Sequence, residues 1–309
     1  MNDDIGDRPA SPLAALPPLR EVIARHDLAA RKGLGQHFLL DLNLTQRIAR
    51  VAGDFTGVTV IEVGPGPGGL TRALLGTGAR AVVAIERDRR CIAALTDLVD
   101  ASAGRLRVIE ADALTIDPVQ LVPAPRAIVS NLPYNVGTPL LIGWLKQMPA
   151  FVSLTLMFQK EVADRIVAAP GSKSYGRLAV ITQWQAVARP LFNLPARAFT
   201  PPPRVDSTVV HLVPVARPEP ALFAAMEAVT AAAFGQRRKM LRASLRSLGD
   251  AEGLIAAAGL VPTMRAEEVP VAGFAALARH FAATRTVTTA RLDPAAPGGD
   301  GPVMPESAP

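Results

Sequence analysis

Short runs of branched apolar residues alternate with segments of helical character between residues 58 and 158. These runs predict five strands, at residues 58–63, 81–86, 106–111, 126–131 and 151–158. Such alternation is typical of a parallel sheet with helices between successive strands. The runs are almost continuously apolar, as expected for strands that helices cover on both faces. The pattern therefore predicts an α/β fold with a mostly parallel sheet and helices on both faces.

The hydrophobic pattern changes beyond Pro190. Residues 192–215 predict two strands joined by a loop that prolines stiffen, and residues 220–283 predict only helices. We therefore expect an α/β domain over residues 19–215 and a small, all-helical domain over residues 216–284.

The two ends of the chain differ from the rest in composition. Prolines interrupt residues 1–18, and residues 285–309 are rich in Pro, Gly and Thr without periodicity, so we predict a disordered leader and a disordered tail. The start lacks the basic residues and apolar stretch of a signal peptide. No run reaches the ~18 apolar residues of a membrane span. We expect a soluble, cytoplasmic protein.

The charge balance is moderately basic, with 33 Lys and Arg against 27 Asp and Glu and a formal charge of +6. Only five of these basic residues are lysine, and arginine makes forked contacts to phosphate. This fits a nucleic-acid partner, although it also fits many other proteins. The single cysteine, Cys91, excludes a disulfide framework within one chain, and the four histidines show no metal-ligand spacing, so we expect no metal.

A glycine-rich loop follows the first predicted strand of the sheet. Gly64, Gly66 and Gly69 match the pattern G-x-G-x-x-G between a strand and a helix. Glycines allow a sharp turn and let a ligand approach the backbone. The pattern predicts a Rossmann-like nucleoside-cofactor site, and a tight turn without a ligand is the alternative.

Two acidic residues follow at the ends of the next two strands. Glu86 ends its strand about 20 residues beyond the loop, where a carboxylate can accept hydrogen bonds from ribose hydroxyls. Asp112 follows the third strand at the same edge and can bind the amino group of a cofactor adenine. NAD and S-adenosylmethionine both carry an adenine and such a ribose, so these residues leave the cofactor open.

The fourth strand runs into Asn131-Leu132-Pro133-Tyr134, a motif that fits the methylation of an adenine amino group. The lone pair of that nitrogen is delocalised into the ring, which makes it a poor nucleophile. The Asn131 oxygen and the Pro133 carbonyl could accept its two N–H bonds and hold it pyramidal. Tyr134 could stack on a base that has left its helix. An ordinary turn after the strand is the alternative.

The ordered set of motifs resembles the KsgA family of small-subunit ribosomal RNA adenine-N6,N6-dimethyltransferases, over roughly residues 31–283. Besides the cofactor motifs, the resemblance lies in residues 31–41, 158–168, 175–180, 199–209 and 234–245. It implies a class I methyltransferase fold with a small helical C-terminal domain. It also implies S-adenosylmethionine as the methyl donor.

The resemblance assigns further residues to the site. It implies that the segment with His37 and Leu39 folds over the cofactor, although the family commonly has asparagine at the position of His37. The cofactor roles of Gly64, Gly66, Glu86, Asp112 and Asn131 carry over directly. It places Phe158 on the far side of the target base from Tyr134, and it places the proline loop at 199–207 beside the target pocket.

An arginine-rich segment lies in the expected helical domain. Arg238, Arg242 and Arg246 recur every four residues, which predicts one stripe on a helix, with Leu241, Leu245 and Leu248 on the other side. Arg237 and Lys239 thicken the stripe. We expect these five basic residues to contact RNA phosphates, and a solvated helix face is the alternative.

These observations lead to one principal interpretation. The resemblance implies an enzyme that dimethylates two adjacent adenosines near the 3′ end of 16S small-subunit rRNA, in a pre-30S particle late in ribosome biogenesis. A monomer without a membrane partner is expected. The alternatives are an NAD-dependent oxidoreductase, an assembly factor without activity, and a large-subunit rRNA adenine methylase.

Overall fold

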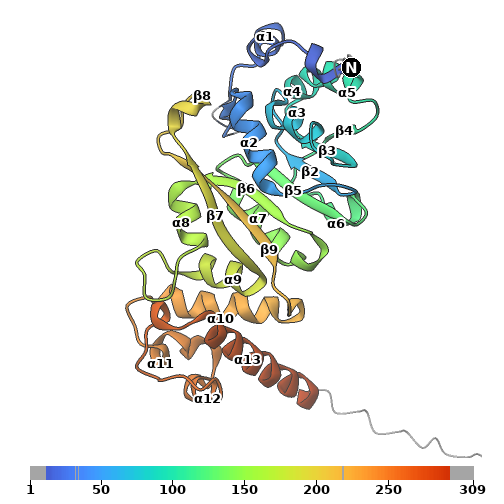
Figure 1. Ribbon diagram of the computed structural model, residues 1–309. Coiled ribbons are helices and arrows are strands. Elements are labelled where there is room, and N and C mark those ends of the chain that lie inside the picture. Colours follow the sequence, from blue (N-terminus) through green and yellow to red (C-terminus); the bar gives the residue numbers. More distant parts are fainter. Residues whose placement is uncertain (1–11, 32, 34, 218, 293–309) are drawn as a thin grey trace, which may run out of the picture.

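The computed structural model describes residues 12–31, 33, 35–217 and 219–292, with side chains up to residue 285. Its main feature is a seven-stranded sheet with the order β4-β3-β2-β5-β6-β9-β7 (Figure 1). The strands are β2 (Thr59–Val63), β3 (Ala81–Glu86), β4 (Leu106–Glu110), β5 (Arg126–Asn131), β6 (Leu154–Gln159), β7 (Ala186–Leu194) and β9 (Ser207–Pro214). Neighbours from β4 to β6 are parallel, and β9 is antiparallel to both β6 and β7.

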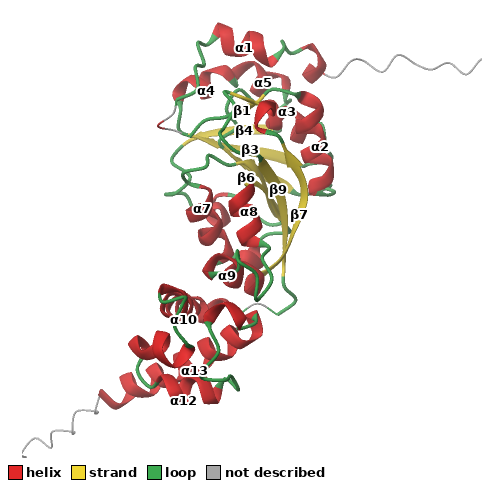
Figure 2. Ribbon diagram, turned by 90° about the vertical axis from the view of Figure 1, so that its left-hand side faces the viewer, coloured by secondary structure: helices red, strands yellow, loops and turns green. Residues whose placement is uncertain are grey.

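Helices cover both faces of this sheet, which confirms the predicted fold class. Figure 2 shows α7 and α8 on the opposite side from α2 and α3. On one side lie α2 (Leu42–Ala52), α3 (Gly69–Leu75), α4 (Arg89–Ala94) and α5 (Thr96–Ala101), and on the other α7 (Gly137–Leu145), α8 (Lys160–Ile166) and α9 (Arg177–Gln185). Successive residues alternate between the two apolar layers: Val60 and Val82 belong to the first, Ile61 and Val83 to the second. The short helices α1 (Leu19–Arg25) and α6 (Pro118–Leu121) complete this part.

Most strand predictions hold closely. The strands at 81–86 and 126–131 match, and those at 58–63 and 106–111 differ by one residue at one end. The fifth begins at Leu154 instead of residue 151. Of the two later strands, β7 begins before Pro190, because β7 lies at the edge of the sheet and its pairing is irregular between Pro190 and Phe192.

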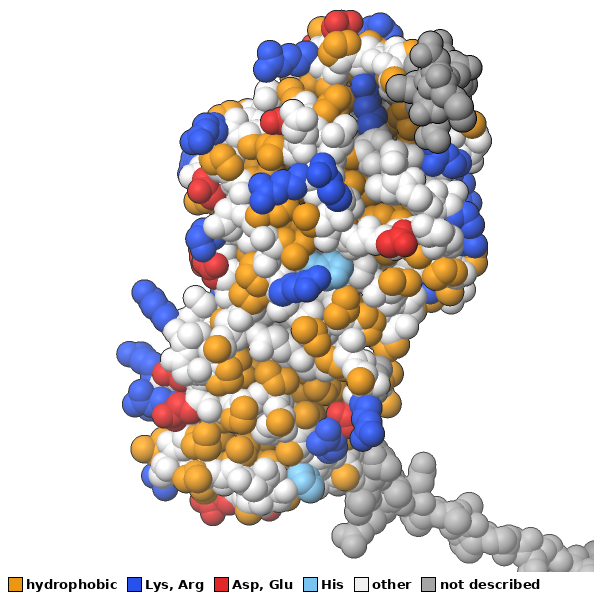
Figure 3. Space-filling model, in the orientation of Figure 1, with side chains coloured by type: hydrophobic (Ala, Val, Ile, Leu, Met, Phe, Trp, Pro, Cys, Tyr) orange, Lys and Arg blue, Asp and Glu red, His pale blue; other side chains and the backbone are white. Residues whose placement is uncertain are grey.

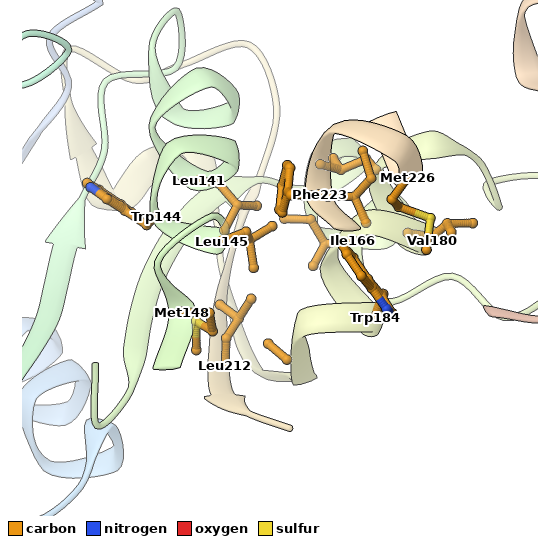
Figure 4. Close-up of a cluster of buried hydrophobic side chains, with 14 of the residues drawn as sticks. Leu141, Trp144, Leu145, Met148, Ile166, Val180, Trp184, Leu212, Phe223 and Met226 are labelled. Carbon is orange, nitrogen blue, oxygen red and sulfur yellow. The ribbon is translucent and has the colours of Figure 1, made fainter. Parts of the chain in front are cut away.

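The C-terminal part is helical, as predicted, and packs directly on α9. It contains α10 (Phe223–Gly235), α11 (Leu241–Ser244), the 3-10 helix η6 (Leu245–Leu248), α12 (Ala251–Ala257) and α13 (Val271–Leu292). Figure 4 shows Phe223 and Met226 of α10 converging with Trp184 of α9 and with Ile166. All four belong to one apolar cluster that also includes sheet residues. The domain boundary at residue 216 stays a prediction.

Part of each end that was predicted to be disordered has regular secondary structure. Pro12–Ala15 form a 3-10 helix, and Leu13 and Leu16 pack against the apolar layer beside α2, so the prediction was wrong for residues 12–18. At the other end α13 continues to Leu292, because residues 284–292 contain neither Pro nor Gly. The rest of the predicted leader and tail lies outside the described residues.

The described part of the chain contains no helix that is long and apolar enough to cross a membrane. Within it, no group of three or more His, Cys, Asp and Glu side chains is arranged to hold a metal ion, and the lone cysteine is buried.

Candidate active site

A pocket lies at the carboxyl ends of the parallel strands, which is where ligands bind in sheets of this kind. Residues from the loops after β2, β3, β4 and β5 and from the segment 35–39 line it. The predicted site residues that line this pocket are His37, Leu39, Gly64, Gly66, Glu86, Asp112, Asn131, Pro133 and Tyr134. The structure thus gathers at one edge residues that are far apart in the sequence.

The loop between β2 and α3 requires glycine for two reasons: its backbone conformation, and the closeness of neighbouring residues. Gly64 and Gly66 have φ angles of 69° and 55°. A Cβ atom on Gly66 would lie 3.0 Å from the ring of Phe38, and one on Gly69 would lie 2.7 Å from the Leu39 carbonyl oxygen. The motif therefore allows the segment containing residues 38 and 39 to pack directly on the loop.

Glu86, at the end of β3, is held by backbone N–H groups. Its Oε1 accepts hydrogen bonds from the N–H groups of Arg87 and Asp88, both at 2.8 Å, and its Oε2 accepts one from Gly66 at 3.3 Å. Burial raises the pKa of Glu86, and the three backbone hydrogen bonds oppose that shift. The carboxylate is held in one orientation, and its Oε2 can accept a further hydrogen bond from a ligand hydroxyl.

Asp112 follows β4, and both of its carboxylate oxygens have partners. Oδ1 accepts a hydrogen bond from the Leu114 N–H at 3.0 Å, and Oδ2 lies 3.2 Å from Nη1 of Arg87. Arg87 also lines the pocket, although it was not predicted from the sequence. The pair is partly exposed, and such ion pairs contribute only about 0–1 kcal/mol, so a ligand amino group can replace the guanidinium at low cost.

Glu62 is a second pocket residue that was not predicted from the sequence. It lies in β2, is 1% exposed, and its Oε2 has no hydrogen-bond partner among the described residues. Burial raises the pKa of Glu62 to about 8, and the nearby Glu86 adds to the shift. The sequence does contain a signal for Glu62, which is an acidic residue inside an apolar run. Such a position is unusual because acidic residues are rarely buried without a partner.

Asn131, at the end of β5, has an oriented side-chain amide. Its Nδ2 donates a hydrogen bond to the carbonyl oxygen of His37 at 3.2 Å. This contact turns the nitrogen toward the segment 35–39 and leaves Oδ1 as the acceptor that a target amine can use. The strand end and the covering segment together fix the predicted catalytic amide.

The structure contradicts the acceptor role predicted for the Pro133 carbonyl. This oxygen accepts hydrogen bonds from the N–H groups of Val136 and Gly137, both at 3.1 Å, at the start of α7. Two backbone donors engage both of its lone pairs, so none is left for a target amine. The Leu132 carbonyl, one residue earlier, accepts no hydrogen bond from any described residue, and Leu132 lines the pocket.

The two aromatic residues predicted to face the target base lie in different surroundings. Tyr134 lines the pocket with its hydroxyl 2.6 Å from Oγ of Ser207, and burial raises the pKa of Tyr134, which keeps the hydroxyl protonated. Phe158 is 3% exposed and does not line the pocket. It shares a face of β6 with Leu154 and Leu156, and this face packs on α7. The place predicted for Phe158 beside the target base stays a prediction.

The segment 35–39 is joined to both sides of the pocket. β1 (Phe38–Leu39) pairs with β8 (Phe199–Thr200), at the start of the proline loop. Nε2 of Gln36 donates to Oδ2 of Asp88 at 3.1 Å, and a 2.7 Å ion pair links Arg90 to the same oxygen. The hydrogen bonds from Arg90 lower the pKa of Asp88 to about 2, so this anchor is ionised throughout the neutral range.

The predicted basic stripe is not one helix face. α10 ends at Gly235, Arg238 lies in the following turn, Arg242 lies in α11, and Arg246 lies in the 3-10 helix η6. The helix is interrupted because Met240 forms a β-bridge with a residue after α12. The leucines of this segment are nevertheless turned inward: Leu241 and Leu245 are buried, and Leu248 is partly buried.

The basic residues of this segment nevertheless remain close together in the chain. Arg238, Lys239, Arg242 and Arg246 are exposed. Arg237 differs, because it pairs with Glu267 at 2.7 Å and donates to a neighbouring backbone carbonyl. Lys and Arg side chains project from the edge of the molecule beside these C-terminal helices (Figure 3).

Comparisons with known proteins agree with this geometry. The family model described as "Ribosomal RNA adenine dimethylase" matches residues 28–283. A "Ribosomal RNA small subunit methyltransferase A" from Paramagnetospirillum magneticum is 65% identical, over 86% of this chain and 95% of the relative. A protein of the same name from Rhodospirillum rubrum is 62% identical, over 93% of this chain and 100% of the relative.

Solved structures are similar to both parts of the chain. A dimethyladenosine transferase from Plasmodium falciparum has a TM-score of 0.68 and 25% identity, over 81% of this chain and 98% of that one. The 23S rRNA methyltransferase ErmE has a TM-score of 0.61 and 28% identity, over 79% of this chain and 99% of that one. The fold is that of the class I methyltransferases, and the chain belongs to the ribosomal RNA adenine dimethylase family.

Proposed function

We propose that this enzyme methylates the N6 amino groups of two adjacent adenosines near the 3′ end of 16S small-subunit rRNA, with S-adenosylmethionine as the methyl donor. The observation that carries the proposal is the oriented amide of Asn131, which shares one pocket with Glu86 and Asp112. A target amine and a nucleoside cofactor can thus meet at a single edge of the sheet.

The pocket residues fit S-adenosylmethionine. Glu86 offers Oε2 to the ribose hydroxyls, and Asp112 can exchange Arg87 for the amino group of the adenine. The unpartnered Oε2 of Glu62 offers an acceptor to a cationic group. S-adenosylmethionine, when bound, supplies an electrophilic methyl group on a positively charged sulfur.

The residues at the end of β5 would act on the nucleophile. Oδ1 of Asn131 and the carbonyl oxygen of Leu132 can accept the two N–H bonds of the adenine amine, which directs its lone pair out of the ring plane. Tyr134 provides a neutral ring on which the extruded base can stack, a contact worth about 1–3 kcal/mol. The methylated nitrogen is acidic enough to lose a proton to water, so no strong base is required.

The identity of the target separates this proposal from its alternatives. The relatives that are 60–65% identical are named for the small ribosomal subunit, whereas the large-subunit enzyme ErmE is only 28% identical. We therefore favour the small subunit over a large-subunit methylase. An oxidoreductase is not favoured, because the matching family model and the most similar relatives are ribosomal RNA methylating enzymes.

The exposed residues Arg238, Lys239, Arg242 and Arg246 are our proposed phosphate contacts on the substrate. We propose that the substrate is a pre-30S particle in the cytoplasm and that the protein acts on it as a monomer. Only Arg237 of the predicted set is tied into the fold by an ion pair.

The proposal is tested by mass spectrometry of small-subunit rRNA from cells that lack this protein. We expect both N6,N6-dimethyladenosines to be absent and to return when the intact gene is supplied, but not when Asn131→Ala is supplied. Normal dimethylation in the cells that lack the protein, or loss of a methyl group from large-subunit rRNA alone, would overturn the proposal.

A further inference from the structure

His37 lies between two elements that bound the target side of the pocket. Its Nδ1 is 2.8 Å from the carbonyl oxygen of Pro201, in the proline loop. Its ring centroid is 5.2 Å from that of Tyr134, with an angle of 31° between the planes. The side chain thus contacts residues of two loops that are distant in sequence.

The hydrogen bond to Pro201 continues the pairing between two short strands. β1 and β8 pair Phe38 with Thr200, so the next position of the same register sets His37 opposite Pro201. Proline has no N–H group to donate to a ladder. The ring nitrogen of His37 binds the proline carbonyl instead, and the contact between the two segments extends by one residue.

The backbone near His37 lies close to the loop that follows β5. Gly35 has a φ of 62°, and a Cβ atom there would lie 2.8 Å from Oδ1 of Asn135. The carbonyl of His37 also accepts the hydrogen bond from Asn131. Residue 37 therefore contacts the catalytic amide through its main chain and the stacking tyrosine through its ring.

Tyr134 is consequently held at two places. Its hydroxyl is anchored to Ser207 at the start of β9, and its ring contacts the tilted ring of His37. A ring with two supports has less freedom to rotate, and binding a base to a preorganised surface loses less entropy. The His37 ring is placed to limit this motion.

We propose that the His37 side chain is a positioning residue for the target base: it ties the proline loop to residues 35–39 and sets the ring of Tyr134. This proposal rests on the proposed function and assigns the side chain to the RNA side of the pocket, not to the cofactor. The main-chain contact with Asn131 is present whatever the side chain.

The test compares His37→Ala and His37→Phe with the unaltered protein and with His280→Ala, a control histidine exposed on α13. Methyl transfer to undermethylated small-subunit particles gives kcat and KM, and calorimetry gives the Kd of S-adenosylmethionine. His37→Ala is expected to lower kcat/KM for the particle about tenfold, the scale of one net hydrogen bond, with the cofactor Kd unchanged within about twofold. His37→Phe keeps a ring beside Tyr134, so its kcat/KM should lie between that of His37→Ala and that of the unaltered protein.

A double-mutant cycle separates this role from a general structural one. In a Tyr134→Ala background, His37→Ala should have almost no further effect on kcat/KM, because the ring it sets has gone. Full additivity, an unchanged kcat/KM in the single variant, or a parallel loss of cofactor affinity would each overturn the proposal. Absence of transfer by the unaltered protein would instead overturn the proposed function, and this proposal with it.

Discussion

The edge of the sheet and the C-terminal basic segment hold the side chains that we propose to be functional in opposite ways. At the sheet edge, Glu86, Asp112 and Asn131 are each tied by a hydrogen bond to a backbone group of another residue. In the basic segment, Arg242 and Arg246 are exposed, on short elements of different kinds. Chemistry requires atoms in fixed positions, whereas contact with phosphates tolerates mobile side chains.

The largest effect that we predict follows from removing the side-chain amide of Asn131 at the sheet edge. Asn131→Ala should lower kcat by about 10²- to 10³-fold, the usual cost of one preorganised group that acts in the transition state. The Kd of S-adenosylmethionine should stay nearly constant. Single-turnover methyl transfer and calorimetry provide the two numbers, and Asn43→Ala, an exposed asparagine on α2, is the control. Equal losses in rate and in cofactor affinity would indicate a structural role.

Glu86→Ala should have the next largest effect, and on a different quantity. It should weaken cofactor binding by roughly 1.5–3 kcal/mol, the range for hydrogen bonds to a charged group. Glu110 ends the neighbouring strand but is exposed and pairs with Arg89, so Glu110→Ala is the matched control. Calorimetry that shows unchanged affinity for Glu86→Ala would place the cofactor elsewhere.

For the basic segment, we predict a change in how steeply binding to the particle depends on the salt concentration. Changing Arg238, Arg242 and Arg246 together to alanine should weaken binding to the particle while cofactor binding is unaffected. Each lost phosphate contact should reduce the slope of log K against log salt by about 0.7–0.9. The control removes the same charge from exposed arginines of the sheet domain: Arg20, Arg50 and Arg107. Identical slopes for the two triple variants would show that the segment only faces water.

The remaining prediction concerns stability, not rate or binding, and comes from Glu62. Because burial raises its pKa to about 8 in the fold, the folded state holds a proton that the unfolded state loses above the ordinary value of 4.5. Stability should therefore fall as pH rises between those values, by up to about 1.4 kcal/mol per pH unit. Urea unfolding at several pH values should show a flatter profile for Glu62→Gln. Parallel profiles would mean that the carboxyl is ionised in the fold.

The same contrast explains what the sequence could predict. The strands ending at Glu86 and Asn131 were predicted to the residue, because carboxyl ends of parallel strands share one edge and local periodicity marks each strand. The helix predicted to carry Arg238 and Arg242 was wrong, because a turn and a long-range bridge at Met240 separate these two residues. Local spacing carries no information about such a contact.

Within the site, the errors also involve tertiary contacts. The carbonyl of Pro133 was assigned to the target amine, but it accepts two hydrogen bonds from backbone N–H groups at the start of α7. Arg87 and Glu62 were missed, because their proximity to the pocket follows from how neighbouring strands are packed.

One measurement tests most directly whether this pocket carries adenine dimethylation. Purified protein is incubated with S-adenosylmethionine and undermethylated small-subunit particles, and the rRNA is digested and analysed by mass spectrometry. We predict N6,N6-dimethyladenosine at two adjacent positions near the 3′ end, and none with Asn131→Ala. Unmodified small-subunit rRNA after incubation with a protein that binds the cofactor, or methylation of large-subunit rRNA in its place, would contradict the prediction.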